Sequence, residues 1–190
     1  MNDKVKWVRL GDYIEQCDER NIDGKYTLND VRGISIQKKL IPTKADMNDV
    51  LLTPYKLLKP HEFSYVTVTS RNGEKISLAM NDTCNIYLVS SSYEIFRCKD
   101  CNDLMPEYLY LLLSRPEFDC YSRFNSWGSA RETFDWPEME RVQIPLPAIE
   151  VQQVIVDVYR CMERAKYIAS QAREKLKTLC PALVQRAAHA

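Results

Sequence analysis

The sequence predicts an α+β fold, with a globular mixed α/β domain over residues 1–147 and one long coiled-coil helix over residues 148–190. Three observations support this prediction. A hairpin pattern lies near the middle of the chain. Two prolines just before residue 148 interrupt regular secondary structure, and an unbroken heptad pattern of apolar residues follows them. At 190 residues and 45% hydrophobic content, the chain is long enough to bury a core of its own.

The first stretch, VKWVRLGDYIEQC, predicts a short strand, a turn at Gly11 and then a short helix. Asp12 can cap this helix, and Glu15 follows three residues later, as in a capping box. Further along, VRGISI (residues 31–36) is rich in β-branched residues and predicts a second strand.

The clearest strand signal is SYVTVTSRNGEKISLAM, residues 64–80. Strand-forming residues alternate with polar ones on both sides of Asn72 and Gly73, the pair that best tolerates the positive φ angles of a tight hairpin turn. We therefore expect a hairpin whose tip presents Arg71, Asn72 and Lys75 outward. One or two more strands are predicted in NIYLVSSSYEIFRC, residues 85–98.

Helical sequence follows in LMPEYLYLLLSRPEFDCYSRF, residues 104–124. Pro106 is expected in a first turn, and Pro116 either breaks the helix or begins a second one. In DWPEMERVQIPLP, Asp135 and Pro137 predict a helix of one or two turns before a strand at VQI. Pro145 and Pro147 then mark the expected domain boundary.

The segment FNSWGSARETFDW, residues 124–136, has neither helical nor strand periodicity for long, so it predicts a loop. It carries two tryptophans, three small hydroxyl residues in its central part and an arginine within it, with a second arginine just before it. Loops held by a rigid scaffold often carry recognition.

From residue 148 onward the sequence is helical, with apolar residues separated alternately by four and three positions. This spacing is an uninterrupted heptad seam, and a helix of such length needs a partner along it. Three alanines at mid-seam indicate close approach of another helix, and Pro181 is expected to kink or end the regular coil. The alternative is a helix packed on its own domain. The seam residues are Val151, Ile155, Val158, Met162, Ala165, Ala169, Ala172, Leu176, Leu179 and Leu183.

The 26 basic and 26 acidic residues give a formal charge of zero, so the global charge indicates no nucleic-acid partner. Its distribution is uneven, because residues 37–80 hold seven basic and four acidic side chains. The sequence has no apolar run long enough to span a membrane and no leader at its start, so we expect a cytoplasmic protein.

Seven cysteines without framework spacing suit a reducing compartment. Cys98 and Cys101 form the one close pair, and a metal or redox role for this CxxC is a minor alternative because the partner ligands are missing. There is no glycine-rich phosphate loop and no nucleophile elbow. The sequence therefore predicts a protein without catalytic residues or a metal site, which recognises a ligand and docks through its long helix.

Four stretches together carry a family resemblance: RGISIQKKLIPTKADM, YKLLKPHEFSYVTVTSRNGEKISLAMN, PEYLYLLLSRPEFDCYSRFNSWGSARETFDW and VQIPLPAIEVQQVIVDVY. They resemble the target recognition domain and following conserved helix of the DNA specificity subunit of type I restriction-modification systems. Family members usually contain two recognition domains joined by two antiparallel helices. This sequence resembles a half-length form with one of each.

The resemblance implies a non-catalytic subunit that reads one half of a bipartite target in double-stranded DNA. It implies a homodimer through the C-terminal helices, with no cofactor in the chain itself. Partner methyltransferase subunits would bind S-adenosylmethionine and methylate adenine, with or without a restriction subunit. A coiled-coil adaptor that binds protein and not DNA is the alternative from another class.

Two groups of residues are candidates for DNA contact on this reading. In the predicted loop, the arginines suit phosphates or guanine edges, the serines suit phosphates, and Trp127 suits stacking. The alternative is that Trp127, Phe134 and Trp136 pin the loop to the core while Arg131 pairs with an acidic neighbour. The loop candidates are Arg123, Ser126, Trp127, Ser129 and Arg131, and the candidates from the basic segment are Lys38, Lys39, Lys56, Arg71, Asn72 and Lys75.

Overall fold

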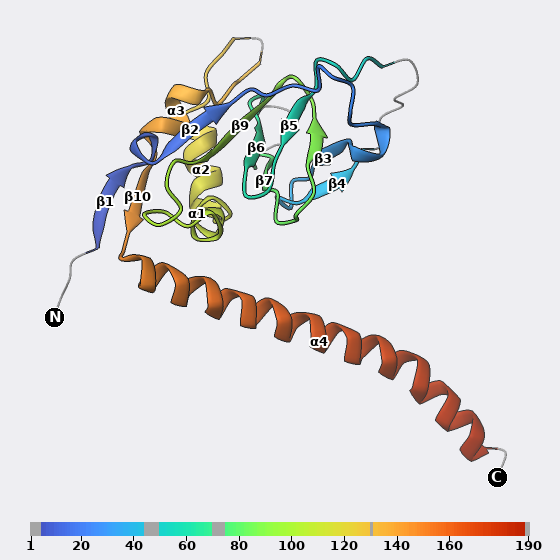
Figure 1. Ribbon diagram of the computed structural model, residues 1–190. Helices are drawn as coiled ribbons and strands as arrows, with labels where there is room; N and C mark the ends of the chain where they lie inside the picture. The colour runs from blue at the N-terminus through green and yellow to red at the C-terminus, as the bar shows by residue number, and fades with distance from the viewer. Residues whose placement is uncertain (1–4, 44–49, 70–74, 130, 189–190) are drawn as a thin grey trace. The chain divides into compact units, whose positions relative to one another are not determined.

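The structure, a computed structural model, describes residues 5–43, 50–69, 75–129 and 131–188, with side chains described up to residue 177 and at Leu179. It has the predicted α+β fold, with a globular unit and a long C-terminal helix (Figure 1). The chain divides into two compact units, Met1–Gln152 and Gln153–Ala190. We describe each unit by itself.

The centre of the first unit is a four-stranded antiparallel sheet in the order β2-β9-β6-β7. Its strands are β2 (Ile14–Cys17), β9 (Tyr93–Cys98), β6 (Phe63–Val66) and β7 (Leu78–Met80). The helix predicted after Gly11 is wrong, because residues 14–17 form strand β2 after a short 3-10 turn at Leu10–Asp12. Pairing of β2 along the whole of β9 outweighs the local capping pattern, which is a weak signal by itself.

The predicted hairpin is present, although its strands are shorter than expected. Strands β6 and β7 pair antiparallel, with Phe63 opposite Met80 and Tyr65 opposite Leu78. The expected tip, residues 70–74, lies outside the described residues. Beyond Val66 the chain pairs instead with the loop before α3, through a bridge between Val68 and Thr133.

Three two-stranded sheets complete the β structure. Strand β1 (Lys6–Arg9) pairs with β10 (Gln143–Leu146), so the first and last strands of the unit lie side by side. Strand β3 (Arg32–Ile34) pairs with β4 (Leu40–Pro42), and β5 (Lys56–Leu58) pairs with β8 (Tyr87–Val89). The predicted strand at VRGISI and the two strands between residues 85 and 98 are confirmed.

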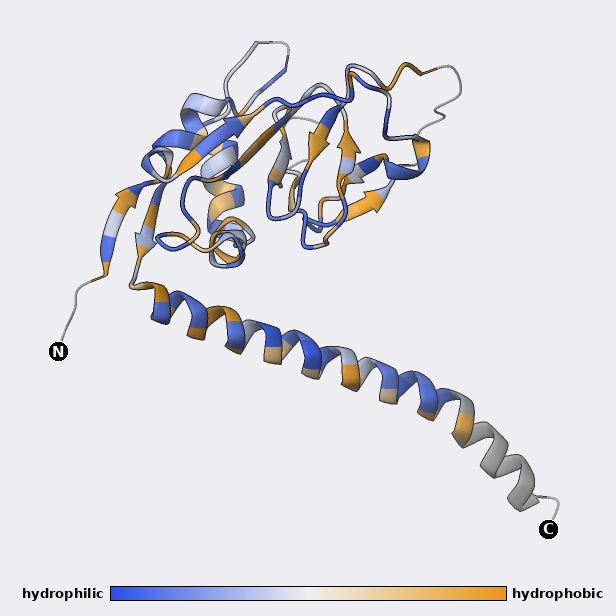
Figure 2. Ribbon diagram, viewed as in Figure 1, coloured by the Kyte–Doolittle hydropathy of each residue, from blue (hydrophilic) through white to orange (hydrophobic). Residues whose placement is uncertain are grey.

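Three short helices follow the sheet in the chain: α1 (Pro106–Leu113), α2 (Pro116–Phe124) and α3 (Trp136–Arg141). Each begins with proline in its first two positions, as the sequence predicts. Aromatic rings join two of them to the sheet: Trp136 of α3 lies 5.8 Å from Phe96 of β9, and the buried Phe134 contacts Tyr65 of β6 and Phe118 of α2 edge to face. In Figure 2 the apolar residues of the unit concentrate on the sheet strands and on α1.

The second unit is almost all of helix α4, which runs from Ile149 to Ala188. At about 1.5 Å per residue, its 40 residues span roughly 60 Å. The helix continues past Pro181, so the expectation that it ends there is wrong. A proline inside a helix removes one hydrogen bond without always ending the element.

The boundary predicted after Pro147 falls slightly before the division of the structure at Gln152. The first turn of α4 belongs to the globular unit because the buried Gln152 side chain ties it there. Its amide donates hydrogen bonds to the carbonyls of Asp103 and Pro147, and its oxygen accepts one from the Met105 N–H.

Candidate functional site

The loop between α2 and α3, residues 125–135, extends away from the body of the unit (Figure 1). Its C-terminal side is anchored at Phe134, which is completely buried. The Phe134 N–H donates to the Thr67 carbonyl at 2.9 Å, and the Thr69 N–H donates to the Glu132 carbonyl at 3.0 Å. The loop is therefore attached to the chain that continues strand β6, so its base has a fixed position on the sheet.

The two arms of this loop are joined below its tip by a pair of backbone hydrogen bonds between Trp127 and Thr133. Each N–H donates to the carbonyl of the other residue, at 3.0 and 2.9 Å. Gly128 follows with φ of 137°, and a Cβ atom there would lie 2.1 Å from the Arg131 carbonyl oxygen. Only glycine fits this backbone, which keeps Trp127 next to the tip.

The predicted loop residues have different environments. Ser126 is buried and its hydroxyl donates to the Ser122 carbonyl at 2.6 Å, so the prediction that this serine bonds a phosphate is wrong. Arg123 is partly exposed and forms an ion pair with Glu132. Ser129 and Arg131 are exposed, and no ion pair of Arg131 occurs within the described part of the chain.

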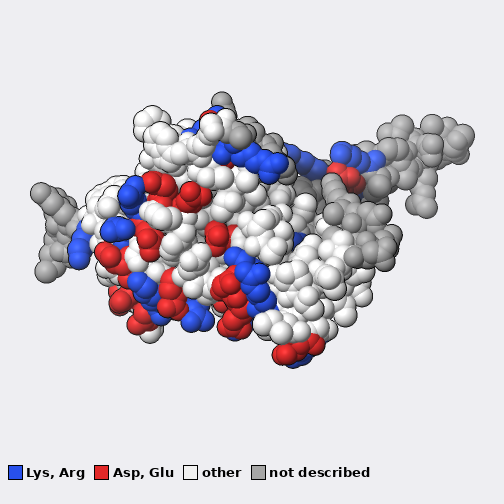
Figure 3. Space-filling model, turned by 90° about the horizontal axis from the view of Figure 1, so that it is seen from above, with Lys and Arg blue, Asp and Glu red and all other residues white. Residues whose placement is uncertain are grey.

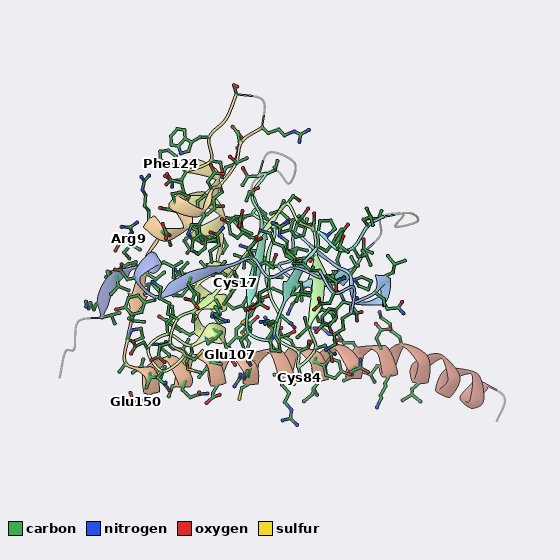
Figure 4. All side chains as sticks on the ribbon, turned by 45° about the horizontal axis from the view of Figure 1, so that its top comes forward. Arg9, Cys17, Cys84, Glu107, Phe124 and Glu150 are labelled. Carbon is green, nitrogen blue, oxygen red and sulfur yellow. The ribbon has the colours of Figure 1, made fainter. Side chains whose placement is uncertain are left out.

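The reading in which the aromatics pin the loop to the core is right for Phe134 and Trp136 but not for Trp127, whose stacking on DNA stays a prediction. Phe134 and Trp136 do hold the loop base, since Phe134 is buried and the Trp136 ring lies 5.8 Å from that of Phe96. Trp127, however, is 64% exposed. Phe124, at the C-terminal end of α2, is 80% exposed and lies on the outer side of the unit (Figure 4). Sequence reasoning missed Phe124, because an isolated phenylalanine at a helix end is normally a core residue.

Lys38 does not lie on a binding surface, and the prediction that it contacts DNA is wrong. Its side chain is 5% exposed, with Nζ 2.7 Å from Asp119 Oδ1 and donating to the Leu113 carbonyl at 2.7 Å. Burial lowers the pKa of Lys38 below the ordinary lysine value, while Asp119 opposes that shift. Lys38 is used to attach the turn between β3 and β4 to helices α1 and α2.

Lys56 is also an interior residue, which contradicts its assignment to DNA. Its ammonium group lies 3.1 Å from Asp18 and 3.6 Å from Glu94, and the side chain is 6% exposed. A lysine held by two carboxylates in the interior is not free to neutralise a phosphate.

Two lysines of the basic segment, Lys39 and Lys75, are exposed. Lys39 follows Lys38 and Lys75 precedes Ile76, and both Lys38 and the Ile76 N–H bind Asp119 of α2. Both lysines therefore lie near the helix that ends at Phe124. Arg71 and Asn72 fall outside the described residues.

Charges of both signs are interspersed over much of the face in Figure 3, and no large patch of one sign forms among the described residues there. Affinity for a polyanion would have to come from individual placed cations, such as Arg131, Lys39 and Lys75, rather than from a broad basic surface.

The seam of α4 is exposed wherever its side chains are described. Val158 is 64% exposed, Leu176 57% and Leu179 55%, and Ile155 and Met162 are about two fifths exposed. Val154 and Ile168, which lie beside the seam, are also more than half exposed. The side chain of Leu183 lies outside the described part of the chain.

The CxxC pair has the environment of ordinary thiols. Burial raises the pKa of Cys98 to about 12 and also raises that of Cys101, so neither is a ready thiolate at neutral pH. Within the described residues, no group of three or more His, Cys, Asp or Glu side chains could hold a metal ion. No described helix is long and apolar enough to cross a membrane.

Residues 2–177 match the protein family described as type I restriction modification DNA specificity domain. No curated protein sequence matches the chain closely enough to count as a relative.

Among solved structures, the chain is similar to a protein chain in a structure that describes complex assembly and conformational transition of the type I R-M system. The identity is 19% and the TM-score 0.53, over 92% of this chain and 43% of that one. It is also similar to the type I restriction-modification system S subunit from M. genitalium, with 13% identity and a TM-score of 0.52, over 90% of this chain and 42% of that one. These similarities show a shared fold, and the chain spans less than half the length of either protein.

Proposed function

Because the chain belongs to the type I restriction modification DNA specificity domain family, we propose that it recognises one half of a bipartite target in double-stranded DNA. The observation that carries this proposal is the α2–α3 loop. It is held at its base by Phe134, closed between Trp127 and Thr133, and displays Arg131 and Ser129 to solvent. A fixed loop with an exposed guanidinium suits contact with a base edge or a phosphate.

The cations near α2 would add contacts to the DNA backbone. Lys39 and Lys75 are exposed beside the element that leads into the loop, whereas Lys38 and Lys56 serve the interior. Each phosphate contact contributes affinity that falls with salt and is independent of sequence. Arg131 would therefore contribute to specificity and the lysines to general affinity.

The proposal assigns no catalytic step to this chain. Methylation of adenine would be carried out by partner methyltransferase subunits, which would also bind S-adenosylmethionine. A restriction subunit would join the complex where the host encodes one. Such a complex would act on DNA in the cytoplasm. The chain itself would supply the recognition.

Two copies of the chain would be needed to read both halves of a target. The exposed seam of α4 supports self-association, because a helix of this length with an apolar seam is poorly stable alone in water. The seam spacing reads the same in both directions along the sequence. In an antiparallel pair, Ala165 of one copy can lie opposite Ala169 of the other, which places Ile155 opposite Leu179 and Val158 opposite Leu176.

The experiment is a selection of duplexes from a randomised library by the chain purified with its methyltransferase subunits. We expect enrichment of a split, palindromic motif, and a binding constant that falls steeply with salt. Arg131→Ala should relax the preference at one position by about 1–3 kcal/mol, whereas Lys75→Ala should weaken all duplexes alike. Recovery of the complex without any enriched motif would contradict the proposal and favour a protein-binding adaptor.

A further inference from the structure

Two aromatic rings at the α2–α3 loop are open to solvent, although the unit buries Phe118 and Phe134 nearby. Phe124 is 80% exposed and Trp127 is 64% exposed, whereas Phe118 and Phe134 are 5% and 0% exposed. Neither exposed ring contacts another ring or a cation within the described residues. Large apolar side chains in this setting usually mark an interaction site.

The loop presents these rings from a fixed backbone. Trp127 is held by both of its backbone groups, through the hydrogen bonds with Thr133. Phe124 is the last residue of α2, and the next residue, Asn125, donates from its N–H and its side chain to the Tyr121 carbonyl. The backbone positions from which both rings project are therefore set before any partner arrives, which lowers the backbone entropy lost on binding.

The surrounding groups indicate a flat ligand that carries negative charge. Arg131 is exposed at the tip, while Arg123, which precedes Phe124, and Glu132 compensate each other in an ion pair. Ser129 adds a hydroxyl group that can donate to a phosphate. Flat apolar faces with an exposed guanidinium group beside them suit nucleobases on a phosphate backbone better than they suit an aliphatic protein surface.

We propose that Phe124 and Trp127 stack on bases of the bound duplex and unstack one base step of the half-site. This inference rests on the proposed function, since it requires that the chain bind DNA. Insertion of apolar side chains between base pairs is a known way to open or kink a duplex, and an exposed ring can be inserted in this way. The pair would make the choice of target depend on how easily that step deforms, in addition to the bonds made by Arg131.

The test uses the complex with methyltransferase subunits and the selected duplex, with 2-aminopurine placed at successive positions of one half-site. Fluorescence of this base rises when it is unstacked and stays low where an aromatic ring covers it, so the rise is read at the bases of the opened step that no ring covers. We compare the unchanged chain with Phe124→Leu and Trp127→Leu, which keep an apolar side chain but remove the flat ring. Trp7→Leu is the matched control, because Trp7 is 63% exposed on strand β1, outside the loop.

We expect each loop variant to bind the duplex about 5- to 100-fold more weakly and to lose most of the fluorescence rise, because the ring supplies the stacking. Trp7→Leu should change neither quantity. Weaker binding with an unchanged fluorescence rise would overturn the inference, as would a loss of methyltransferase assembly in the loop variants, which would make the rings a protein contact. If the unchanged complex selects no duplex, the proposed function fails as well, so the two failures are distinguishable.

Discussion

Replacing Lys38 should destabilise the globular unit strongly, although lysine is ordinarily a surface residue. Lys38→Met leaves the carboxylate of Asp119, which is 11% exposed, without the ammonium group that lies 2.7 Å away. Removing one partner of a buried ion pair costs roughly 3–5 kcal/mol, a large part of the 5–15 kcal/mol by which proteins are typically stable. The Ile76 N–H at 3.3 Å compensates only in part, because it is a neutral donor.

The double variant Lys38→Met with Asp119→Asn tests where that loss comes from. Asparagine removes the buried charge and keeps an oxygen that can accept from the Ile76 N–H, so the double variant should recover more than half of the loss. Lys39→Met is the matched control. Lys39 is the exposed neighbour, and its replacement should change stability by less than about 0.5 kcal/mol.

The measurement is urea unfolding of the full chain, followed by tryptophan fluorescence at the globular unit. Equal changes of the midpoint in Lys38→Met and Lys39→Met would contradict a buried role for Lys38, as would a double variant no more stable than Lys38→Met. Duplex binding should then be compared without urea, at a temperature where every variant is folded. There Lys38→Met should bind like the unchanged chain, because its role is in the interior.

Three further predictions follow from other parts of the structure. Ala169→Glu places a carboxylate in the seam at a close helix contact, at a cost of several kcal/mol, so sedimentation should show a monomer at tens of micromolar while the globular unit stays folded. Gly128→Ala forces a Cβ atom against the Arg131 carbonyl and should reduce duplex binding, whereas Gly24→Ala, in open space at φ of 63°, should cost about 1 kcal/mol of stability without affecting binding. Burial raises the pKa of Glu62, so the protonated Glu62 side chain stabilises the fold below its ordinary pKa. This stabilisation is lost as pH rises through the raised pKa of the folded state. Urea unfolding from pH 4 to 8 should show the decline in stability, and Glu62→Gln should abolish that decline.

Elements with a complete local signal could be predicted from the sequence. Proline in the first turn located α1 and α3, one of the two readings of Pro116 located α2, and alternation around Asn72 and Gly73 located the β6–β7 hairpin. Strand β2 was predicted as a helix because Asp12 and Glu15 imitate a capping box. Its pairing with β9 joins residues about 80 positions apart, which no local pattern contains.

The candidate site was predictable as a segment but not residue by residue. Lys38 and Lys39 are adjacent and chemically identical, yet one is buried against Asp119 and the other is exposed. That difference is decided by a turn in which Lys38 takes φ of 59°, a conformation that composition does not reveal. Ser126 was misassigned because its hydroxyl group bonds to the Ser122 carbonyl in the last turn of α2, which ends just before it.

The pairing of β1 with β10 affects how the globular unit can be exchanged between genes, as well as how it folds. Lys6 lies opposite Leu146, so the globular unit begins and ends at neighbouring points of one small sheet. A module whose two ends meet can be cut from one gene and inserted into another without stretching the flanking chain, and circular permutation is tolerated for the same reason. Recombination within β1 and β10 could thus exchange the globular unit with its α2–α3 loop as one piece, leaving the long helix that follows it unchanged.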